Sequence, residues 1–290
     1  MKVLIVKGWH GFGDRLESLQ MCIHYALEKK RMIYVDWTDN IWSHGKESFY
    51  TYFQLVNIPV LKSLDEIPET ATVFPPAWKG NLSTPLSTEF MSTNVLDTQV
   101  YDYKDYSEDV VVFSSIGYRR LYKEYSFMGN CLRVIHPRII GKVRNRQLIY
   151  SLTDKLGIHL RGTDRASTSE YKLHRIRQLS VRLVSIGALN GRKMIAVSDD
   201  PEYIKFWNTR FSDTPVLTER GHLGGKQGAH LQSDIPISKD DLNVDMLVDF
   251  FTLASCQSII STSPDSRFTH EATRLHLFVN QILSQNGCSV

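Results

Sequence analysis

The first 36 residues, MKVLIVKGWHGFGDRLESLQMCIHYALEKKRMIYVD, contain the pattern that decides the fold. An apolar run at residues 3–6 and a second at residues 32–35 each have the length of a buried strand. Between them, a glycine-containing loop precedes apolar residues at positions 16, 19, 23 and 26, which share one face of a helix. A strand, a helix and a strand in this order predict two parallel strands joined by a crossover helix.

The second half of the chain restarts this alternation. Strands are predicted over residues 156–160, 194–197 and 258–261, and helices over residues 176–186, 201–211 and 246–254. Residues 37–109 contain scattered Pro, Ser and Thr, so we expect short elements and loops there. The chain is therefore predicted to form an α/β domain over residues 1–150 and a second one over residues 151–270. An amphipathic helix over residues 271–290 is predicted to close the chain.

Composition excludes several classes of protein. Of 290 residues, 42% are apolar and 22% charged, which is typical of a globular protein and excludes a disordered chain or a coiled-coil rod. A net charge of +3 does not suggest a duplex nucleic-acid binder. We find no signal peptide and no apolar run near the roughly 20 residues of a membrane span. Four cysteines without a C-x-x-C pair favour a reducing compartment, so we expect a cytoplasmic protein.

The loop after the first strand contains Gly11, Gly13 and Asp14. It begins like a dinucleotide fingerprint, but Leu16 stands where the third glycine would be, which argues against a nicotinamide-type site. The glycines either form a tight turn or let the phosphate or sugar of a ligand approach the backbone closely.

The loop after the strand at residues 156–160 is denser in functional groups. Alternation along a strand places His159 and Arg161 on the same side, where both can reach one ligand. Guanidinium groups match phosphate oxygens in geometry and stay charged, so Arg161 and Arg165 are candidate diphosphate ligands. The alternative is a buried ion pair with Asp164.

Two further loops follow predicted strands. Asp199 and Asp200 either support a site or cap the helix that Pro201 opens. The Ser- and Thr-rich residues 261–269, which include Ser266, either cap a helix or bind a phosphate group through hydroxyl and amide groups.

Two other features also leave alternatives open. Residues 119–146 carry eight Lys or Arg against one Glu, which indicates either a solvated helix and linker or a surface facing an anionic acceptor. Tryptophans gather in the first half, where they are either buried or stack on sugar rings; they are Trp9, Trp37, Trp42 and Trp78.

In their order along the chain, these motifs resemble those of the α-1,6-fucosyltransferase family, both its rhizobial nodulation members and the catalytic core of its animal members. HLRGTDR at residues 159–165, followed by Glu170 and His174, is similar to the family's H-x-R-x-T-D-K/R segment. VSDDP at residues 197–201 is similar to A-T-D-D-P. The glycine loop, the VDW at residues 35–37 and the acidic helix and serine-rich loop at residues 249–268 also have counterparts.

The resemblance implies a GT-B-like fold, in which two Rossmann-like domains face a cleft. The first domain would serve the acceptor and the second would bind GDP-fucose as the donor. The implied reaction transfers L-fucose to a glycan hydroxyl with inversion. No metal or other cofactor is expected, and the sequence contains no Asp-x-Asp motif.

The resemblance also implies roles for individual residues. Arg161 and Arg165 would act at the diphosphate, His159 and Asp249 at the guanine, and Asp199 or Asp200 in support, while Asp164, Gly11, Gly13, Asp14 and Ser266 would lie close to the donor. Glu170 is the candidate base for the acceptor hydroxyl, one residue later than the family spacing, with Ser169 in the expected place.

Two alternatives remain at this point. The displaced glutamate also fits a non-catalytic protein that binds a nucleotide sugar or a glycan, and the donor motifs also fit an inverting transferase that uses another GDP-sugar. An acceptor that contains N-acetylglucosamine is expected by analogy with the family alone. No nucleic-acid partner is expected.

Overall fold

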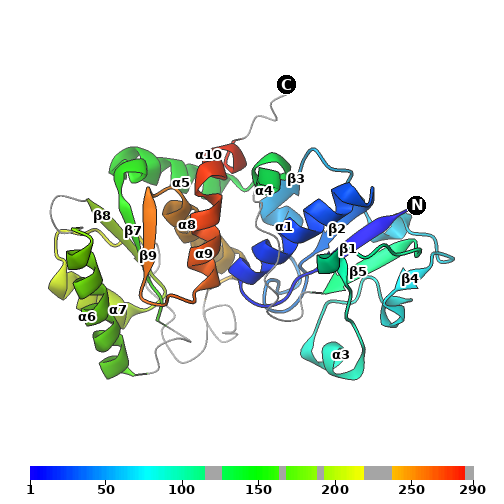
Figure 1. Cartoon of the computed structure of the whole chain (residues 1–290), viewed down its shortest axis with the longest axis horizontal. Coiled ribbons are helices and arrows are strands. Elements are labelled where there is room, and N and C mark those ends of the chain that lie inside the picture. Colours follow the sequence, from blue (N-terminus) through cyan, green and yellow to red (C-terminus); the bar gives the residue numbers. More distant parts are fainter. Residues whose placement is uncertain (115–125, 163–167, 188–192, 219–236, 285–290) are drawn as a thin grey trace. The chain divides into compact units, whose positions relative to one another are not determined.

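The computed structural model describes residues 1–114, 126–162, 168–187, 193–218 and 237–284. The chain divides into two compact units, the first formed by Met1–His136 with Asn280–Val290 and the second by Pro137–Val279. Each unit is an α/β structure around its own parallel sheet (Figure 1). The division lies between His136 and Pro137, whereas the sequence pattern placed it at residue 150.

The first unit opens with the strand, helix and strand predicted from residues 1–36. β1 (Val3–Lys7), α1 (Phe12–Glu28) and β2 (Met32–Asp36) are joined by β5 (Val110–Ser114) and β4 (Val73–Phe74) in the sheet order β2-β1-β5-β4. All three pairings in this sheet are parallel. The α/β class predicted from the apolar pattern is therefore confirmed in this unit.

Short elements fill the rest of the first unit, as expected. They are α2 (Phe49–Tyr52), β3 (Phe53–Leu55), α3 (Thr88–Thr93), α4 (Ser126–Cys131), β6 (Leu132–Val134) and 3₁₀ turns at Leu64–Glu66, Pro76–Trp78 and Val100–Asp102. β3 and β6 form a separate antiparallel pair. Apolar side chains from this segment, including Leu61 and Trp78, cover the sheet face that carries Val3 and Ile5. The burial of large side chains thus orders a segment with little regular structure.

Three of the four tryptophans in the first half are buried. Trp37, Trp42 and Trp78 are at most 2% exposed, and Trp9 is half-buried. For the three buried side chains, packing is therefore the correct interpretation.

The second unit is built on a three-stranded parallel sheet. β7 (Leu156–Leu160) lies between β8 (Met194–Ser198) and β9 (Ser258–Ser261). The helices are α5 (Pro137–Tyr150), α6 (Ser169–Ser185), α7 (Pro201–Arg210), α8 (Lys239–Ala254) and α9 (Arg267–Leu275), and a 3₁₀ turn spans Leu152–Asp154. The predicted strands are therefore confirmed, and the helices begin earlier than predicted at α6 and α8.

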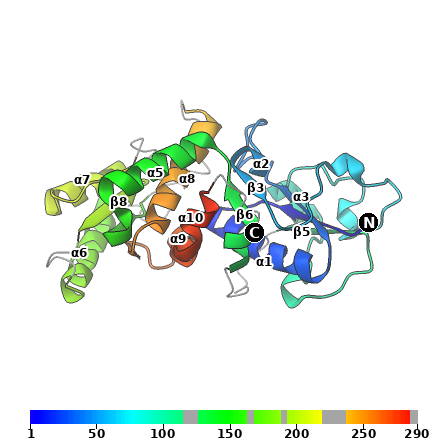
Figure 2. The same ribbon diagram turned by 90° about the horizontal axis from the view of Figure 1, so that it is seen from above.

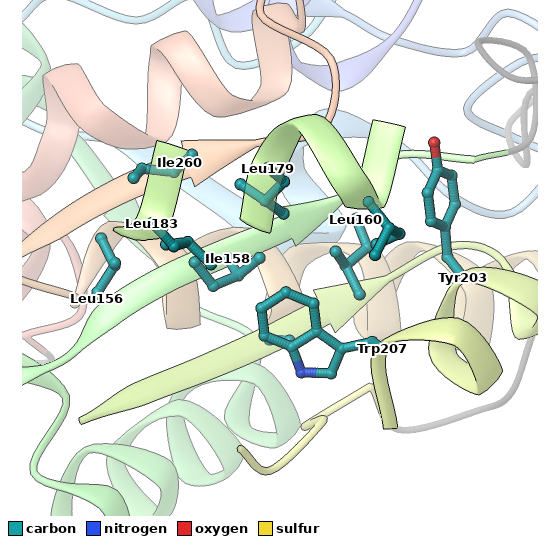
Figure 3. Close-up of a cluster of buried hydrophobic side chains, with 10 residues drawn as sticks. Leu156, Ile158, Leu160, Leu179, Leu183, Tyr203, Trp207 and Ile260 are labelled. Atoms are coloured by element: carbon teal, nitrogen blue, oxygen red, sulfur yellow. The ribbon is translucent and has the colours of Figure 1, made fainter. Parts of the chain in front are cut away.

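Alternation along β7 divides its side chains between two helical layers. Leu156, Ile158 and Leu160 pack against α6 and α7, where Figure 3 shows Leu179, Leu183, Tyr203 and Trp207 around them. On the opposite face, a Cβ at Gly157 would lie 3.1 Å from Cys256 Sγ and 3.1 Å from Leu253 Cδ2. α8 can therefore pack closely on β7, and the odd-numbered residues of the strand face this second layer.

Helices α5 and α8 lie side by side (Figures 1 and 2) and are joined by a row of ion pairs. Arg138 Nη2 lies 2.6 Å from Asp241 Oδ1, Lys142 Nζ lies 3.6 Å from Asp245 Oδ1, and Arg146 Nη1 lies 3.0 Å from Asp249 Oδ1. The spacing of four residues on each helix keeps each set on one face. Within the basic stretch at residues 119–146, Arg138, Lys142 and Arg146 lie on a helix, as one interpretation expected, but they pair with carboxylates of α8 and do not form a linker; residues 119–125 lie outside the described residues.

The described residues from Arg267 onward form two short helices, and residues 285–290 of the predicted closing helix lie outside the described residues. α9 begins at Arg267, a 3₁₀ turn spans His276–Phe278, and α10 covers Val279–Ile282. The imidazole of His276 donates a hydrogen bond through Nδ1 to the carbonyl oxygen of Ala254 at 2.9 Å. The apolar residues that predicted an amphipathic helix are buried, but the 3₁₀ turn divides them between α9 and α10.

The row of ion pairs predicts unequal contributions to stability. Arg146 is buried and also donates to Thr252 Oγ1, whereas the Arg138 side chain is 42% exposed. Arg146→Met should lower the free energy of unfolding by about 3 kcal/mol, because it leaves Asp249 without this cation. Arg138→Met should cost less than about 1 kcal/mol. Urea unfolding followed by circular dichroism measures the free energy of unfolding of both variants. Equal losses would contradict the larger contribution assigned to Arg146.

Candidate functional site

Polar residues follow each of the three strands of the second unit at one edge of the sheet. Arg161 and Gly162 follow β7, Asp199 follows β8, and Thr262 follows β9. Parallel strands end at the same edge, which is where ligands bind in open α/β sheets. The loops predicted from sequence are thus brought together in this unit.

Asp199 holds the loop that follows β7. Its Oδ2 lies 2.8 Å from Arg161 Nη1, and its Oδ1 accepts a hydrogen bond from the backbone N–H of Gly162 at 2.7 Å. The backbone N–H of Arg161 donates to Thr262 Oγ1 at 2.9 Å. The side chain of Arg161 is 18% exposed, so its guanidinium is oriented by protein groups and still reaches the surface.

Asp200 has a different role from its neighbour. Its side chain is fully buried, and its Oδ1 caps α7 by accepting hydrogen bonds from the N–H groups of Glu202 and Tyr203 at 2.9 and 3.0 Å. A Cβ at position 162 would lie 2.2 Å from Asp200 Cβ, so Gly162 is required by close packing. The capping interpretation is therefore correct for Asp200, and Asp199 is the residue that meets Arg161.

His159 lies against α9, on the face of β7 opposite to Leu156, Ile158 and Leu160. The residue is 4% exposed, its Nδ1 lies 2.7 Å from Thr269 Oγ1, and its ring centroid is 5.1 Å from that of Phe268. Ser266 caps α9 and accepts from the N–H of Thr269 at 3.5 Å. The Ser- and Thr-rich loop thus caps a helix, and it also orients His159.

Asp249 of α8 is paired with Arg146 of α5. The two residues are joined at 3.0 Å, and the side chain of Asp249 is 15% exposed. Asp249 and His159 come from different elements of this unit, α8 and β7. The expected joint action of these two residues on a guanine stays a prediction.

Glu170 stands in the first turn of α6. It is exposed, and the helix is capped by Thr168, whose side chain accepts from the N–H of Tyr171. His174 lies one turn further on and is also exposed. Asp164 and Arg165, which were predicted to bind the donor, lie outside the described residues.

In the first unit, the loop after β1 is held by a buried arginine. Arg15 is 1% exposed and binds Asp39 through both terminal nitrogens at 2.9 and 2.7 Å. Its Nε donates to the carbonyl oxygen of His10, and its guanidinium lies 5.4 Å from the ring centroids of Trp37 and Trp42. The shape of this loop therefore depends on an ion pair between aromatic rings.

Neither Gly11 nor Gly13 adopts a left-handed conformation, and the close approach of a ligand to them stays a prediction. Gly11 caps α1 with φ of −74°, Gly13 lies inside the helix, and the left-handed residue of the loop is His10, with φ of 62°. Gly8 is the glycine that packing requires, because a Cβ there would lie 2.0 Å from Arg15 Nη1. Asp14 is half-buried in the first turn of α1.

Sequence reasoning missed three residues that shape these loops. Thr269 contacts His159, Arg15 anchors the loop of the first unit, and Lys172 of α6 binds Asp200 at 2.6 Å. Lys172 could have been noticed as a charged residue at a position of α6 where the helix pattern requires burial. Thr269 carries no comparable signal.

Two kinds of feature are absent from the described part of the chain. It contains no group of three or more His, Cys, Asp or Glu side chains that could hold a metal ion. None of the described helices has the length and apolar character needed to cross a membrane.

Comparison with known proteins identifies the fold. No family model and no curated protein matches the sequence. The fucosyltransferase NodZ from Bradyrhizobium matches with 18% identity over 94% of this chain and 92% of that chain, with a TM-score of 0.69. A structure of NodZ α-1,6-fucosyltransferase soaked with GDP-fucose matches with the same identity and coverage and a TM-score of 0.67.

A more distant match is POFUT1 in complex with GDP. It has 12% identity over 96% of each chain and a TM-score of 0.53. The structural neighbours are therefore fucosyltransferases, and the predicted GT-B-like fold is confirmed.

Proposed function

We propose that this chain is a fucosyltransferase that moves L-fucose from GDP-fucose to a hydroxyl group of a glycan acceptor. The observation that carries the proposal is the oriented guanidinium of Arg161 at the carboxyl edge of β7, in a fold shared with an enzyme that was soaked with GDP-fucose. Such an edge is where a nucleotide sugar would bind in a Rossmann-like unit.

The second unit is proposed to bind the donor. Arg161 would lie at the β-phosphate, because a guanidinium fork matches phosphate oxygens and keeps its charge. Its orientation by Asp199 supports this role, since a fixed charge costs little reorganisation when negative charge develops on the departing GDP. Arg165 is proposed to assist at the same diphosphate, and Asp164 is proposed to lie close to the donor.

His159 and Asp249 are proposed to recognise the guanine. Each is oriented by a partner, His159 by Thr269 and Asp249 by Arg146. Ser266 and the loop of Gly11, Gly13 and Asp14 are proposed to lie close to the donor, with Asp199 and Asp200 in support. The first unit would serve the acceptor, for which we propose a glycan that contains N-acetylglucosamine.

The proposed reaction is a single inverting displacement without a metal ion. Glu170 would accept the proton of the acceptor hydroxyl while its oxygen attacks the anomeric carbon of fucose. The bond between that carbon and the β-phosphate oxygen breaks, and GDP leaves with the electron pair. Arg161 would stabilise the negative charge that GDP gains.

The donor preference tests this proposal directly. Calorimetric titration should give tighter binding of GDP and GDP-fucose than of UDP and UDP-sugars, because the guanine and the diphosphate are both recognised. Incubation with GDP-fucose and a panel of oligosaccharides should then give a product heavier by one fucose residue.

Absence of any guanine preference would overturn the proposal. Binding without a product would favour the non-catalytic alternative, and a preference for GDP-mannose as donor would favour another GDP-sugar transferase.

Arg161→Ala should lower kcat about 10²-fold to 10³-fold, the usual cost of losing one preorganised donor in a site of this kind. The fold should survive, because Asp199 keeps its hydrogen bond from the Gly162 N–H. Arg161→Lys should recover only part of the rate, since it keeps the charge but loses the fork. Steady-state kinetics and circular dichroism measure the two properties, and near-normal turnover of the alanine variant would exclude the phosphate role.

Glu170→Gln should lower kcat by 10²-fold or more, because general bases typically contribute about 10²-fold to 10⁴-fold. The affinity for GDP should change by less than about twofold, since Glu170 is assigned to the acceptor. Glu89→Gln, an exposed glutamate of α3, is the matched control and should leave both quantities unchanged. Unchanged kcat in the Glu170 variant would assign the proton transfer to another group.

A further inference from the structure

A buried lysine links α6 to α7 behind the Arg161 loop. Lys172 is 8% exposed, and its Nζ lies 2.6 Å from Asp200 Oδ2 and 3.0 Å from Glu202 Oε2. The first turns of α6 and α7 are thus joined by an ammonium group and two carboxylates.

The pKa shifts of Lys172 and Glu202 both favour the charged forms of these side chains. Burial lowers the pKa of Lys172, but the hydrogen bonds to Asp200 and Glu202 raise it by more, so that its pKa lies above the ordinary value. The hydrogen bond from Ser169 and the ammonium of Lys172 lower the pKa of Glu202. Lys172 is therefore a cation that compensates the fully buried Asp200.

The position of Asp200 determines the position of the loop after β7. Its Cβ lies where a side chain of residue 162 would be, so the backbone of Gly162 packs directly on it. The N–H of Gly162 donates to Asp199, and the same carboxylate binds Arg161. A buried carboxylate that loses its cation costs several kcal/mol unless it moves toward water. Movement of Asp200 would displace Gly162 and with it the pair of Asp199 and Arg161.

We propose that Lys172 is a positioning residue for Arg161, which acts by neutralising Asp200 and so keeping Gly162 and Asp199 in place. The proposal rests on the proposed function only where it concerns the diphosphate. A displacement of about 1 Å at a site of this kind can cost 10²-fold in rate, so this distant lysine would affect transfer without touching a substrate.

Three variants test the proposal. Lys172→Met removes the charge and keeps much of the side-chain volume. Lys172→Met combined with Asp200→Asn removes both charges and keeps an oxygen that can cap α7. Lys205→Met removes an exposed cation from α7 that lies near Glu202 and has no bond to Asp200 among the described contacts.

The first readout is the preference for GDP over GMP, which lacks the β-phosphate assigned to Arg161. Lys172→Met should raise the Kd of GDP about tenfold, a loss of about 1.4 kcal/mol, and change that of GMP less than about twofold. The double variant should return the Kd of GDP to within about threefold of the original, and Lys205→Met should not change it. An equal rise in the Kd of GDP and of GMP, or no recovery of the Kd of GDP in the double variant, would mean that Lys172 has only a general structural role. Either result would overturn the proposal.

The second readout needs no nucleotide. The rate at which phenylglyoxal modifies Arg161, followed by peptide mass spectrometry, should rise severalfold in Lys172→Met and fall again in the double variant. An unchanged rate would overturn the positioning role. If the original protein shows no preference for GDP over GMP but this labelling pattern appears, the proposed function fails while the positioning role of Lys172 stands.

Discussion

The carboxylate of Asp199 joins the ends of two neighbouring strands, and the candidate site depends on it. One oxygen accepts from the backbone of Gly162 and the other binds the guanidinium of Arg161. Because β7 and β8 are parallel, the two loops leave the sheet at the same edge and a short side chain can span them. Thr262 adds a bond from β9 to the same loop. The orientation of Arg161 is therefore a property of the whole sheet edge.

This orientation has an electrostatic cost. Asp199 neutralises part of the charge of Arg161 before any diphosphate arrives, so the attraction for an anion is weaker than that of an isolated guanidinium. A fixed direction compensates, since side-chain entropy is not lost again on binding. Arg138, Lys142 and Arg146 of α5 and Lys172 of α6 are likewise paired with carboxylates of the same unit. The net charge of +3 therefore gives little information about the local fields of this unit.

The elements that sequence predicted correctly are those with a local signal. Buried strands and the helices α1, α6 and α7 follow from apolar spacing within about 20 residues, because that spacing reflects one face of one element. The pairs that shape the site are distant in sequence. His159 meets Thr269, and Asp249 meets Arg146, more than 100 residues away. Nothing in local spacing encodes such a partner, so the motif residues were identified but their contacts were not.

The glycines of the loops after β1 and β7 also depend on contacts that the sequence pattern does not predict. In the first unit Gly11 and Gly13 form the visible pattern, yet Gly8 is the position where a side chain would strike Arg15. In the second, Gly162 occupies a position that the H-x-R-x-T-D-K/R pattern leaves open, and here any side chain would overlap Asp200. Close packing, rather than backbone conformation, is the constraint at both positions. A side chain at position 162 would force either the β7 loop or Asp200, the aspartate that caps α7, to move. Gly162 and the buried Asp200 therefore depend on each other.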